Sequence, residues 1–292
     1  MLAAVGNTPV IRLDRVEPRG NLFGKAEFLN PTGSVKDRAA ARMIESAMSA
    51  QNRLTNDKQI LDSSSGNTGI SLAAFGAALG FGVTIVIPKS ASLERQKMLR
   101  LLGASIIFSD PLEGADGAIL VARELVKKKP ESYYYIDQYS NEANWRAHYH
   151  GTAEEIWRQT EGQISHFVAG VGTGGTIMGT GRRLKELNPK VKVIAVQPTS
   201  PFHGLEGLKH MQSSLKPRIF DQTFPDQTEY VETEVAQDYV KILASRQGIL
   251  AGTSSGATVS AARKYSEENA ENRVIVVLAD NGSRYMSERY LS

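Results

Sequence analysis

Short apolar segments alternate with longer amphipathic segments along most of this chain, and this alternation restricts the possible folds more than any other feature of the sequence. In the first half, the periodicity predicts strands at residues 10–13, 22–28, 59–62, 83–87, 105–108 and 133–136, and helices at residues 35–50, 68–79, 93–102 and 114–128. Strands that alternate with helices form βαβ units, whose strands lie parallel in one sheet. The first half is therefore expected to be an α/β domain.

The second half repeats this pattern. It predicts strands at residues 166–170, 191–196 and 273–278, and helices at residues 144–159, 176–187, 234–247 and 256–266. Residues 197–228 contain four prolines and show no clear period, so we expect an irregular connection there. A connection of this length in a compact domain is often functional.

Together these patterns predict an α/β fold with two doubly wound domains, mostly parallel sheets and a shared cleft at the carboxyl ends of the strands. The length of 292 residues agrees with two domains. We expect the first domain to span residues 1–141 and the second residues 142–292, with residues 10–30 as candidates for crossing into the second domain.

Composition excludes several classes of protein. The chain has no cysteine, which rules out disulfides, thiolate metal sites and thiol nucleophiles, and no motif indicates a metal site. A net charge of +3 is too small to predict nucleic-acid binding. No apolar run approaches the roughly 18 residues that span a bilayer, and residues 1–5 do not resemble a secretory signal. We therefore expect a cytoplasmic protein that binds neither nucleic acid nor membrane.

One lysine occupies an unusual place. Residues 30–38 read Asn-Pro-Thr-Gly-Ser-Val-Lys-Asp-Arg, so Lys36 lies between a turn and a predicted helix. A cation gains nothing from the positive end of the helix dipole. A lysine with a lowered pKa, or one joined as an imine to a carbonyl cofactor, would suit the position. For a lysine taken alone, an exposed surface residue is the more frequent case.

A glycine-rich loop follows the predicted strand 166–170 and opens a helix. It comprises Gly172, Thr173, Gly174, Gly175 and Thr176. Inward-turned amides at a helix N-terminus suit a phosphate, although a tight strand-to-helix turn explains the motif equally well. The loop is neither a Walker motif nor a dinucleotide fingerprint, since Ile177 stands where the latter needs glycine.

Two further small polar loops precede predicted helices. The first contains Ser64, Ser65, Gly66, Asn67 and Thr68, whose hydroxyls and amides suit a carboxylate. Its alternative explanation is capping of the helix by Ser65 or Asn67. The second spans residues 252–256 and includes Ser254, and a helix cap is again the alternative.

Taken together and in this order, the lysine turn and the three loops resemble the cysteine synthase (O-acetylserine sulfhydrylase) family of pyridoxal-phosphate enzymes of fold type II, which share the tryptophan synthase β-like fold. The similarity extends from residue 6 to residue 285. Ser64 replaces the threonine that is usual in the family's substrate loop. The glycine-rich loop is similar to A-type enzymes, whereas Asp280 and residues 94–96 are B-type-like.

The resemblance implies a role for each motif. Lys36 would be the catalytic residue and would form the imine with pyridoxal 5'-phosphate. The remaining cofactor contacts would come from Asn67 at the ring hydroxyl, Ser254 at the pyridine nitrogen, and Gly172, Thr173, Gly174, Gly175 and Thr176 at the phosphate. The substrate carboxylate would be bound by Ser64, Ser65, Gly66, Asn67, Thr68 and Gln138.

The same resemblance implies an activity and partners. We expect β-replacement that makes L-cysteine, through an α-aminoacrylate, from O-acetylserine or O-phosphoserine and a sulfur donor, either sulfide or thiosulfate. A homodimer is implied, with a serine acetyltransferase or a sulfur-carrier protein as candidate partners. The alternatives are a cystathionine β-synthase-like enzyme, a serine or threonine dehydratase, an inactive relative that binds a peptide, and a nucleotide-binding dehydrogenase. Lys36 argues against the inactive relative, and the missing fingerprint argues against the dehydrogenase.

Overall fold

A computed structural model describes residues 1–18, 21–49, 54–64 and 66–291. The chain forms two compact units: Met1–Val5 with Lys36–Asn144, and Gly6–Val35 with Trp145–Ser292. The second unit takes the whole of Gly6–Val35 because strand β2 pairs with β10, near the end of the chain. The chain consequently passes from the second unit into the first between Val35 and Lys36.

The first unit contains a sheet with the strand order β5-β4-β3-β6, and all neighbours in it are parallel. Its elements are α1 (Lys36–Met48), β3 (Gln59–Ser63), α2 (Asn67–Leu79), β4 (Val83–Pro88), α3 (Leu93–Leu101), β5 (Ser105–Ser109), α4 (Gly114–Lys128) and β6 (Tyr133–Tyr135). Helix α5 (Glu142–Ala147) spans the boundary with the second unit.

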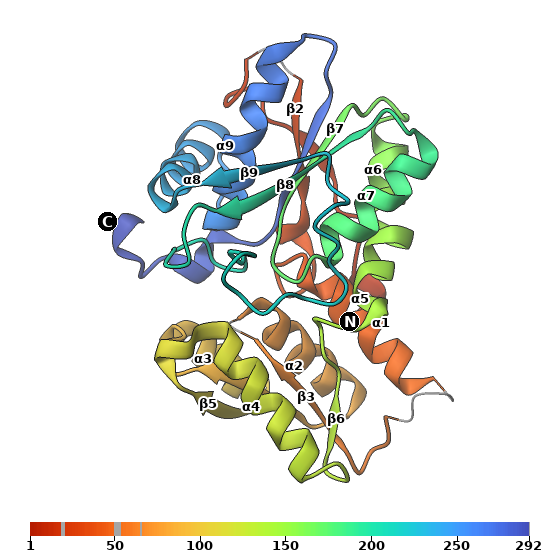
Figure 1. The fold of residues 1–292 in the computed structure, drawn as a ribbon, viewed down its shortest axis with the longest axis vertical. Helices are drawn as coiled ribbons and strands as arrows, with labels where there is room; N and C mark the ends of the chain where they lie inside the picture. Colours follow the sequence, from red (N-terminus) through yellow and green to blue (C-terminus); the bar gives the residue numbers. More distant parts are fainter. Residues whose placement is uncertain (19–20, 50–53, 65, 292) are drawn as a thin grey trace. The chain divides into compact units, whose positions relative to one another are not determined.

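Both faces of this sheet are covered by helices (Figure 1). Ile60 and Ile85 pack with α1, α2 and α3, whereas Leu61 and Val86 pack with α4. Alternate strand residues point to opposite faces, so a strand between two helical layers must be apolar at nearly every position. This is why β4 is buried along its whole length.

The second unit contains a sheet with the order β1-β2-β10-β7-β8-β9, parallel except for the antiparallel pair of β1 and β2. Its elements are β1 (Val10–Arg12), β2 (Leu22–Ala26), the π-helix η4 (His148–Thr152), α6 (Ala153–Gln159), β7 (His166–Gly170), α7 (Gly175–Leu187), β8 (Lys192–Pro198), β9 (Gln227–Val231), α8 (Thr233–Gln247), α9 (Thr253–Glu268) and β10 (Val274–Leu278).

Helices cover both faces of this sheet as well. Val168 and Val276 pack with α8 and α9, and Phe167 and Val277 pack with α6 and α7. The prediction of an α/β fold with two mostly parallel sheets is confirmed. In the described part of the chain, no helix is long and apolar enough to span a membrane.

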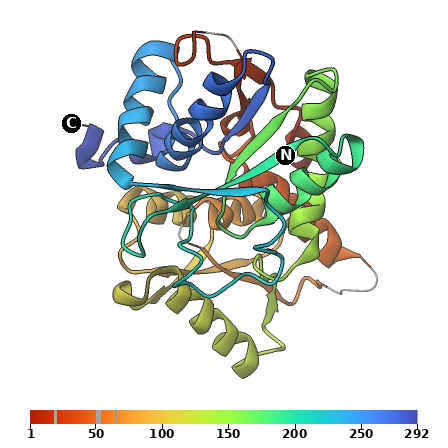
Figure 2. The same ribbon diagram turned by 45° about the horizontal axis from the view of Figure 1, so that its top comes forward.

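Three local predictions from the sequence need correction. The region predicted to be irregular, residues 197–228, lies largely in turns (teal in Figure 2) but ends in edge strand β9, whose residues are mostly not buried. The helix predicted at 144–159 is interrupted by the π-helix, which packs closely on α7: a Cβ on Gly179 would lie 2.8 Å from His148 Cβ and 2.9 Å from Tyr149 N. Helix α9 begins at Thr253, so Ser254 belongs to its first turn rather than to a preceding loop.

A fully buried lysine joins β2 to α6 inside the second unit. Lys25 Nζ lies 2.7 Å from Glu155 Oε2 and 3.0 Å from Gln159 Oε1. Glu155 also accepts the N–H of Asn7 at 2.9 Å. Burying two charges is costly unless each is paired, so removing one partner leaves the other uncompensated.

We expect Lys25→Met to lower the free energy of unfolding by about 3 kcal/mol, because Glu155 keeps its charge without its partner. The double variant Lys25→Met/Glu155→Met should recover part of that loss. Tryptophan fluorescence during chemical denaturation measures the effect, since Trp145 and Trp157 both belong to the second unit. A double variant no more stable than the single one would contradict a buried ion pair.

Candidate functional site

The turn before Lys36 is held by the segment that follows β10. Gly33 adopts a positive φ of 84°, which favours glycine, and its N–H donates to Asn30 O at 2.8 Å. Val35 N–H donates to Ala279 O at 2.8 Å, and Asn281 N–H donates to Gly33 O at 3.1 Å. The guanidinium of Arg284 also donates to Thr32 O. These contacts fix the backbone from which α1 and Lys36 begin.

The same segment, Ala279 to Gly282, holds the start of α9. Gly252 N–H donates to Asp280 O at 3.2 Å, and Gly282 N–H donates to Leu250 O at 3.1 Å. Ser255 Oγ accepts the N–H of Ala279 at 2.9 Å. Within the second unit, the lysine turn and the first turn of α9 are thus brought together. No sequence motif had marked Ala279–Gly282 as a connection between them.

Ser254 lies in that first turn and is buried, with 6% of its surface exposed. The Thr253 hydroxyl accepts the N–H of Glu206 at 3.1 Å and lies 3.0 Å from Gly204 O. The Ser255 hydroxyl is engaged with Ala279. The hydroxyls on either side of Ser254 are therefore engaged in hydrogen bonds within the fold.

The glycine-rich loop joins β7 to α7 as predicted. Gly174 has φ 88°, and the Gly175 N–H donates to Thr173 Oγ1 at 3.3 Å. A Cβ on Gly172 would lie 2.1 Å from Gly207 O, so the loop has no room for a larger residue. The first amides of a helix lack acceptors inside it and carry the positive end of its dipole. Together with the hydroxyls of Thr173 and Thr176, they form a donor set that suits a phosphate.

Two neighbours of this loop were not predicted as site residues. Thr176 Oγ1 lies 3.3 Å from Nε2 of the buried His148, whose Nδ1 lies 2.9 Å from Thr152 Oγ1. The N–H of Lys209, also a buried residue, donates to Val171 O at 2.9 Å. The signal for His148 is its place in a π-helix, which often marks a functional site and which the sequence pattern does not reveal.

The predicted substrate loop connects β3 to α2. Ser64 Oγ accepts the N–H groups of Gly66 at 3.1 Å and Gly69 at 3.0 Å, so Ser64 satisfies amides at the start of the helix. The alternative of capping by Asn67 is wrong, because Asn67 is the first helical residue and Gly66 occupies the cap position without a side-chain bond. Ser65 lies outside the described residues.

Thr68 and Gln138, both predicted to contact substrate, are brought together. Thr68 Oγ1 donates to Gln138 Oε1 at 2.7 Å, and Gln138 Nε2 donates to Ser63 O at 2.7 Å. The Asn144 amide donates to Gln138 O at 2.7 Å. Gln138 is therefore fixed at both its side chain and its main chain, beside the start of α2.

The first turns of α1 and α2 also lie together in the first unit. The Ser71 hydroxyl is 2.5 Å from Asp37 Oδ1 and 3.0 Å from Asn67 O. Asp37 directly follows Lys36, and Asn67 is the first residue of α2. The structure consequently places Lys36 and Asn67 at neighbouring helix N-termini, while Gly172–Thr176 and Ser254 belong to the second unit.

The glycine-rich loop gives a direct test. A Cβ on Gly174 would be strained by its positive φ and would lie 2.6 Å from Phe220 Cβ, whereas one on Gly248, with φ 70°, would meet no atom within 4 Å. Gly248→Ala should lower the free energy of unfolding by about 1 kcal/mol through backbone strain alone. Gly174→Ala should lower it further, because its Cβ also meets Phe220. Inorganic phosphate should raise the melting temperature of Gly248→Ala but not of Gly174→Ala. Equal stabilisation of both variants would contradict an anion site at this loop.

Comparisons with known proteins agree with this geometry. A family model described as pyridoxal-phosphate dependent enzyme matches residues 1–280. A cysteine synthase from Aquifex aeolicus is 49% identical over 301 residues, covering 100% of this chain and 92% of the relative. A cysteine synthase B from Pseudomonas aeruginosa is 38% identical and covers 97% of this chain and 94% of the relative.

Among solved structures, an O-acetyl serine sulfhydrylase isoform from Entamoeba histolytica is similar with a TM-score of 0.90 and 34% identity. The match covers 99% of this chain and 90% of that one. Both the fold and the sequence are therefore shared along nearly the whole length. The chain belongs to the family of pyridoxal-phosphate dependent enzymes.

Proposed function

We propose that this protein is a cysteine synthase, which uses pyridoxal 5'-phosphate to replace the β-substituent of an activated serine with sulfur. The observation that carries this proposal is the combination of a lysine at the start of α1 with a phosphate-type donor set at the start of α7. The 49% identity to a named cysteine synthase over the whole chain supports the same activity. When bound, pyridoxal phosphate supplies an electron sink for negative charge at the substrate Cα.

The residues present fit this cofactor. Gly172, Thr173, Gly174, Gly175 and Thr176 would hold the phosphate through helix amides and hydroxyls. Lys36 would bond to the carbonyl carbon, and Asn67 would donate to the ring oxygen. Ser254 would face the pyridine nitrogen. These roles come from the family resemblance, and the burial of Ser254 and the pairing of the α1 and α2 N-termini support them.

Lys36 would also move the protons of the reaction. Its Nζ, in the neutral form, accepts the proton from the substrate Cα as a general base and returns a proton once sulfur has added at Cβ. A serine hydroxyl at the ring nitrogen does not favour ring protonation as an aspartate would, so Ser254 keeps the electron sink mild. A mild sink favours loss of the β-substituent, whose departure takes up the electrons.

The substrate loop would bind and orient the amino acid. Main-chain amides at the start of α2, including that of Thr68, and the second N–H of the Gln138 side-chain amide would donate to the substrate carboxylate. The Thr68 hydroxyl, whose proton goes to Gln138 Oε1, would hold that side chain in place. Ser64 supports this loop through its bonds to the N–H groups of Gly66 and Gly69. Bonds to a charged carboxylate are about twice as strong as neutral ones, so this loop would contribute much of the substrate affinity.

Basic residues between β8 and β9 are candidates for selecting the leaving group and the sulfur donor. Of the basic residues between β8 and β9, Lys216 and Arg218 are exposed, whereas Lys209 and His210 are buried. Since the Lys209 backbone bonds to the residue before the phosphate loop, Lys209 and His210 are the candidates for contact with an anionic leaving group or sulfur donor. We also propose, from the resemblance, a cytoplasmic homodimer, with a serine acetyltransferase or sulfur-carrier protein as partner.

Steady-state rates with O-acetylserine and O-phosphoserine, each with sulfide or thiosulfate, would identify the substrates. Release of pyruvate without added sulfur donor distinguishes a dehydratase. Cysteine formation from at least one pair supports the proposal, whereas pyruvate as the only product with every pair would contradict it.

Lys36→Ala should abolish cysteine formation while leaving the fold intact, because no other group would take the Cα proton. Lys97→Ala, at an exposed lysine of α3, is the matched control and should keep full activity. Circular dichroism verifies folding, and a coupled assay measures cysteine. Substantial turnover by folded Lys36→Ala without added amine would exclude Lys36 as the base.

Ser254→Asp should retain the cofactor but lower turnover by about tenfold or more, a change of at least about 1.4 kcal/mol in the barrier. An aspartate favours a protonated ring nitrogen and over-stabilises charge at Cα. Ser260→Asp on the same helix is the control. If Ser254→Asp turns over O-acetylserine as fast as the unmodified enzyme, Ser254 does not face the ring nitrogen.

A further inference from the structure

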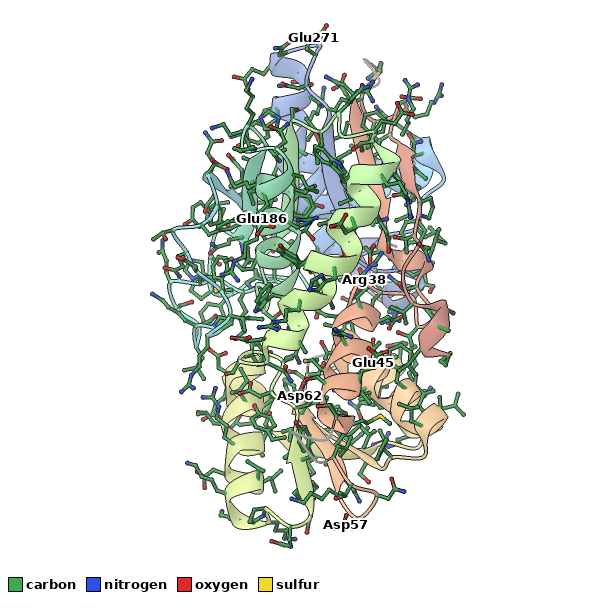
Figure 3. The ribbon with its side chains drawn as sticks, turned by 90° about the vertical axis from the view of Figure 1, so that its right-hand side faces the viewer. Arg38, Glu45, Asp57, Asp62, Glu186 and Glu271 are labelled. Carbon is green, nitrogen blue, oxygen red and sulfur yellow. The ribbon has the colours of Figure 1, made fainter. Side chains whose placement is uncertain are left out.

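A carboxyl group with no assigned role lies behind the substrate loop. Asp62, the fourth residue of β3, is labelled in Figure 3 and is fully buried. Its Oδ1 accepts the N–H of Ser63 at 2.9 Å. In the described residues, its Oδ2 has no hydrogen-bond partner of ordinary geometry, and the same holds for the buried hydroxyls of Ser63 and Tyr135. A buried charge without partners is expensive, so this group calls for an explanation.

The surroundings of Asp62 favour its neutral form. Burial raises the pKa of Asp62 well above its ordinary value of 3.8, and the nearby Asp137 raises it further, whereas N–H groups of Ser63 and Gln138 lower it. Four more titratable groups lie around Asp62: Tyr135, Tyr139, and Asp116 and Arg123 of α4. Burial, and after it the charge of Asp62, raises the pKa values of both tyrosines. Arg123 lowers the pKa of Tyr135, whereas Asp116 raises that of Tyr139.

A short chain of contacts connects Asp62 to the predicted carboxylate-binding groups. The first contact is the one at 2.9 Å between the Ser63 N–H and Asp62 Oδ1. Gln138 Nε2 bonds to Ser63 O, and Gln138 Oε1 accepts the Thr68 hydroxyl at 2.7 Å. Asp62 is thus connected through Ser63, the residue that ends β3, to the glutamine that accepts the Thr68 hydroxyl.

We propose that Asp62 is a positioning residue, which holds Gln138 and the end of β3 in place behind the substrate loop and so sets the affinity of the loop for the substrate carboxylate. This inference rests on the proposed function, because it takes Thr68 and Gln138 as substrate-binding groups. Asp62 itself does not touch the substrate. Its neutral form matters, since a negative charge near the loop would repel the carboxylate that the loop must bind.

The first experiment measures the positioning without using activity. Hydrogen-exchange mass spectrometry on the holoenzyme should show faster exchange of residues 136–144 in Asp62→Ala, because Ser63, whose carbonyl holds Gln138, loses its bond to Asp62. Asp62→Asn keeps the shape and an acceptor at Oδ1, so its exchange should match that of the unmodified protein. Equal exchange in all three proteins would overturn the positioning role.

The second experiment tests the charge state. A carboxyl whose pKa is raised by folding stabilises the protein fully below about pH 3.8, and this stability is lost as pH rises through the folded pKa. The melting temperature of Asp62→Asn relative to the unmodified protein should therefore increase with pH. Asp57→Asn is the control, because Asp57 is exposed at the other end of β3 and its pKa is lowered (Figure 3). If the difference in melting temperature between Asp62→Asn and the unmodified protein does not change with pH, Asp62 is not neutral in the folded protein.

The third experiment connects Asp62 to substrate affinity. Loss of one positioned hydrogen bond changes affinity about tenfold, so Asp62→Ala should raise KM for O-acetylserine by about tenfold with little change in kcat. Asp62→Asn should restore KM at neutral pH, and the ratio of the unmodified KM to that of Asp62→Asn should rise with pH. Asp57→Asn should leave both constants unchanged. A fall in kcat with constant KM would overturn the proposal.

A double-mutant cycle separates this inference from the proposed function. If Asp62 acts through Gln138, the effects of Asp62→Ala and Gln138→Ala on KM should be non-additive. Additive effects would overturn the inference and leave the proposed function standing. If Gln138→Ala and Thr68→Ala both leave KM unchanged, the proposed substrate loop fails, and with it the effect of Asp62 on affinity, even when the exchange experiment supports the positioning.

Discussion

The backbone hydrogen bonds of Ala279–Gly282 are the constraint on which the site of the second unit depends. This segment continues β10, and it bonds both to the turn before Lys36 and to the start of α9. The chain leaves the second unit directly after that turn, so α1 starts from a backbone fixed by the second unit. A lysine that bonds to a cofactor, as we propose for Lys36, needs such a fixed starting point.

Parallel strands explain why the other groups stand at helix N-termini. Strand β3 in one sheet and strand β7 in the other are each followed by a short loop and a helix. The first amides of that helix carry a positive partial charge. The loop after β7 offers glycine amides suited to a phosphate, while the loop after β3 offers amides suited to a carboxylate. Gln138, which follows β6, is bonded to Thr68 beside the second loop. One architectural rule therefore produces two candidate anion sites, which differ in the side chains around their amides.

The sequence predicted the elements with strong periodicity, such as β4 and α4, because burial on one or two faces leaves a clear apolar pattern. It missed β9, an edge strand with little buried surface, and the π-helix, which packs closely against Gly179. The lysine turn and the phosphate loop were recognisable as motifs. The cap formed by Ser64 and the burial of Asp62, Lys209 and His148 were not, because each arises from contacts that the local sequence does not encode.

We propose above all that Lys36 is the residue bonded to pyridoxal phosphate. Reduction of the holoenzyme with borohydride makes that bond permanent, and mass spectrometry of the digested protein locates the pyridoxyl group. We expect the group on the peptide that contains Lys36. A pyridoxyl group on another lysine, such as the buried Lys209 beside the phosphate loop, or on no lysine at all, would contradict the account.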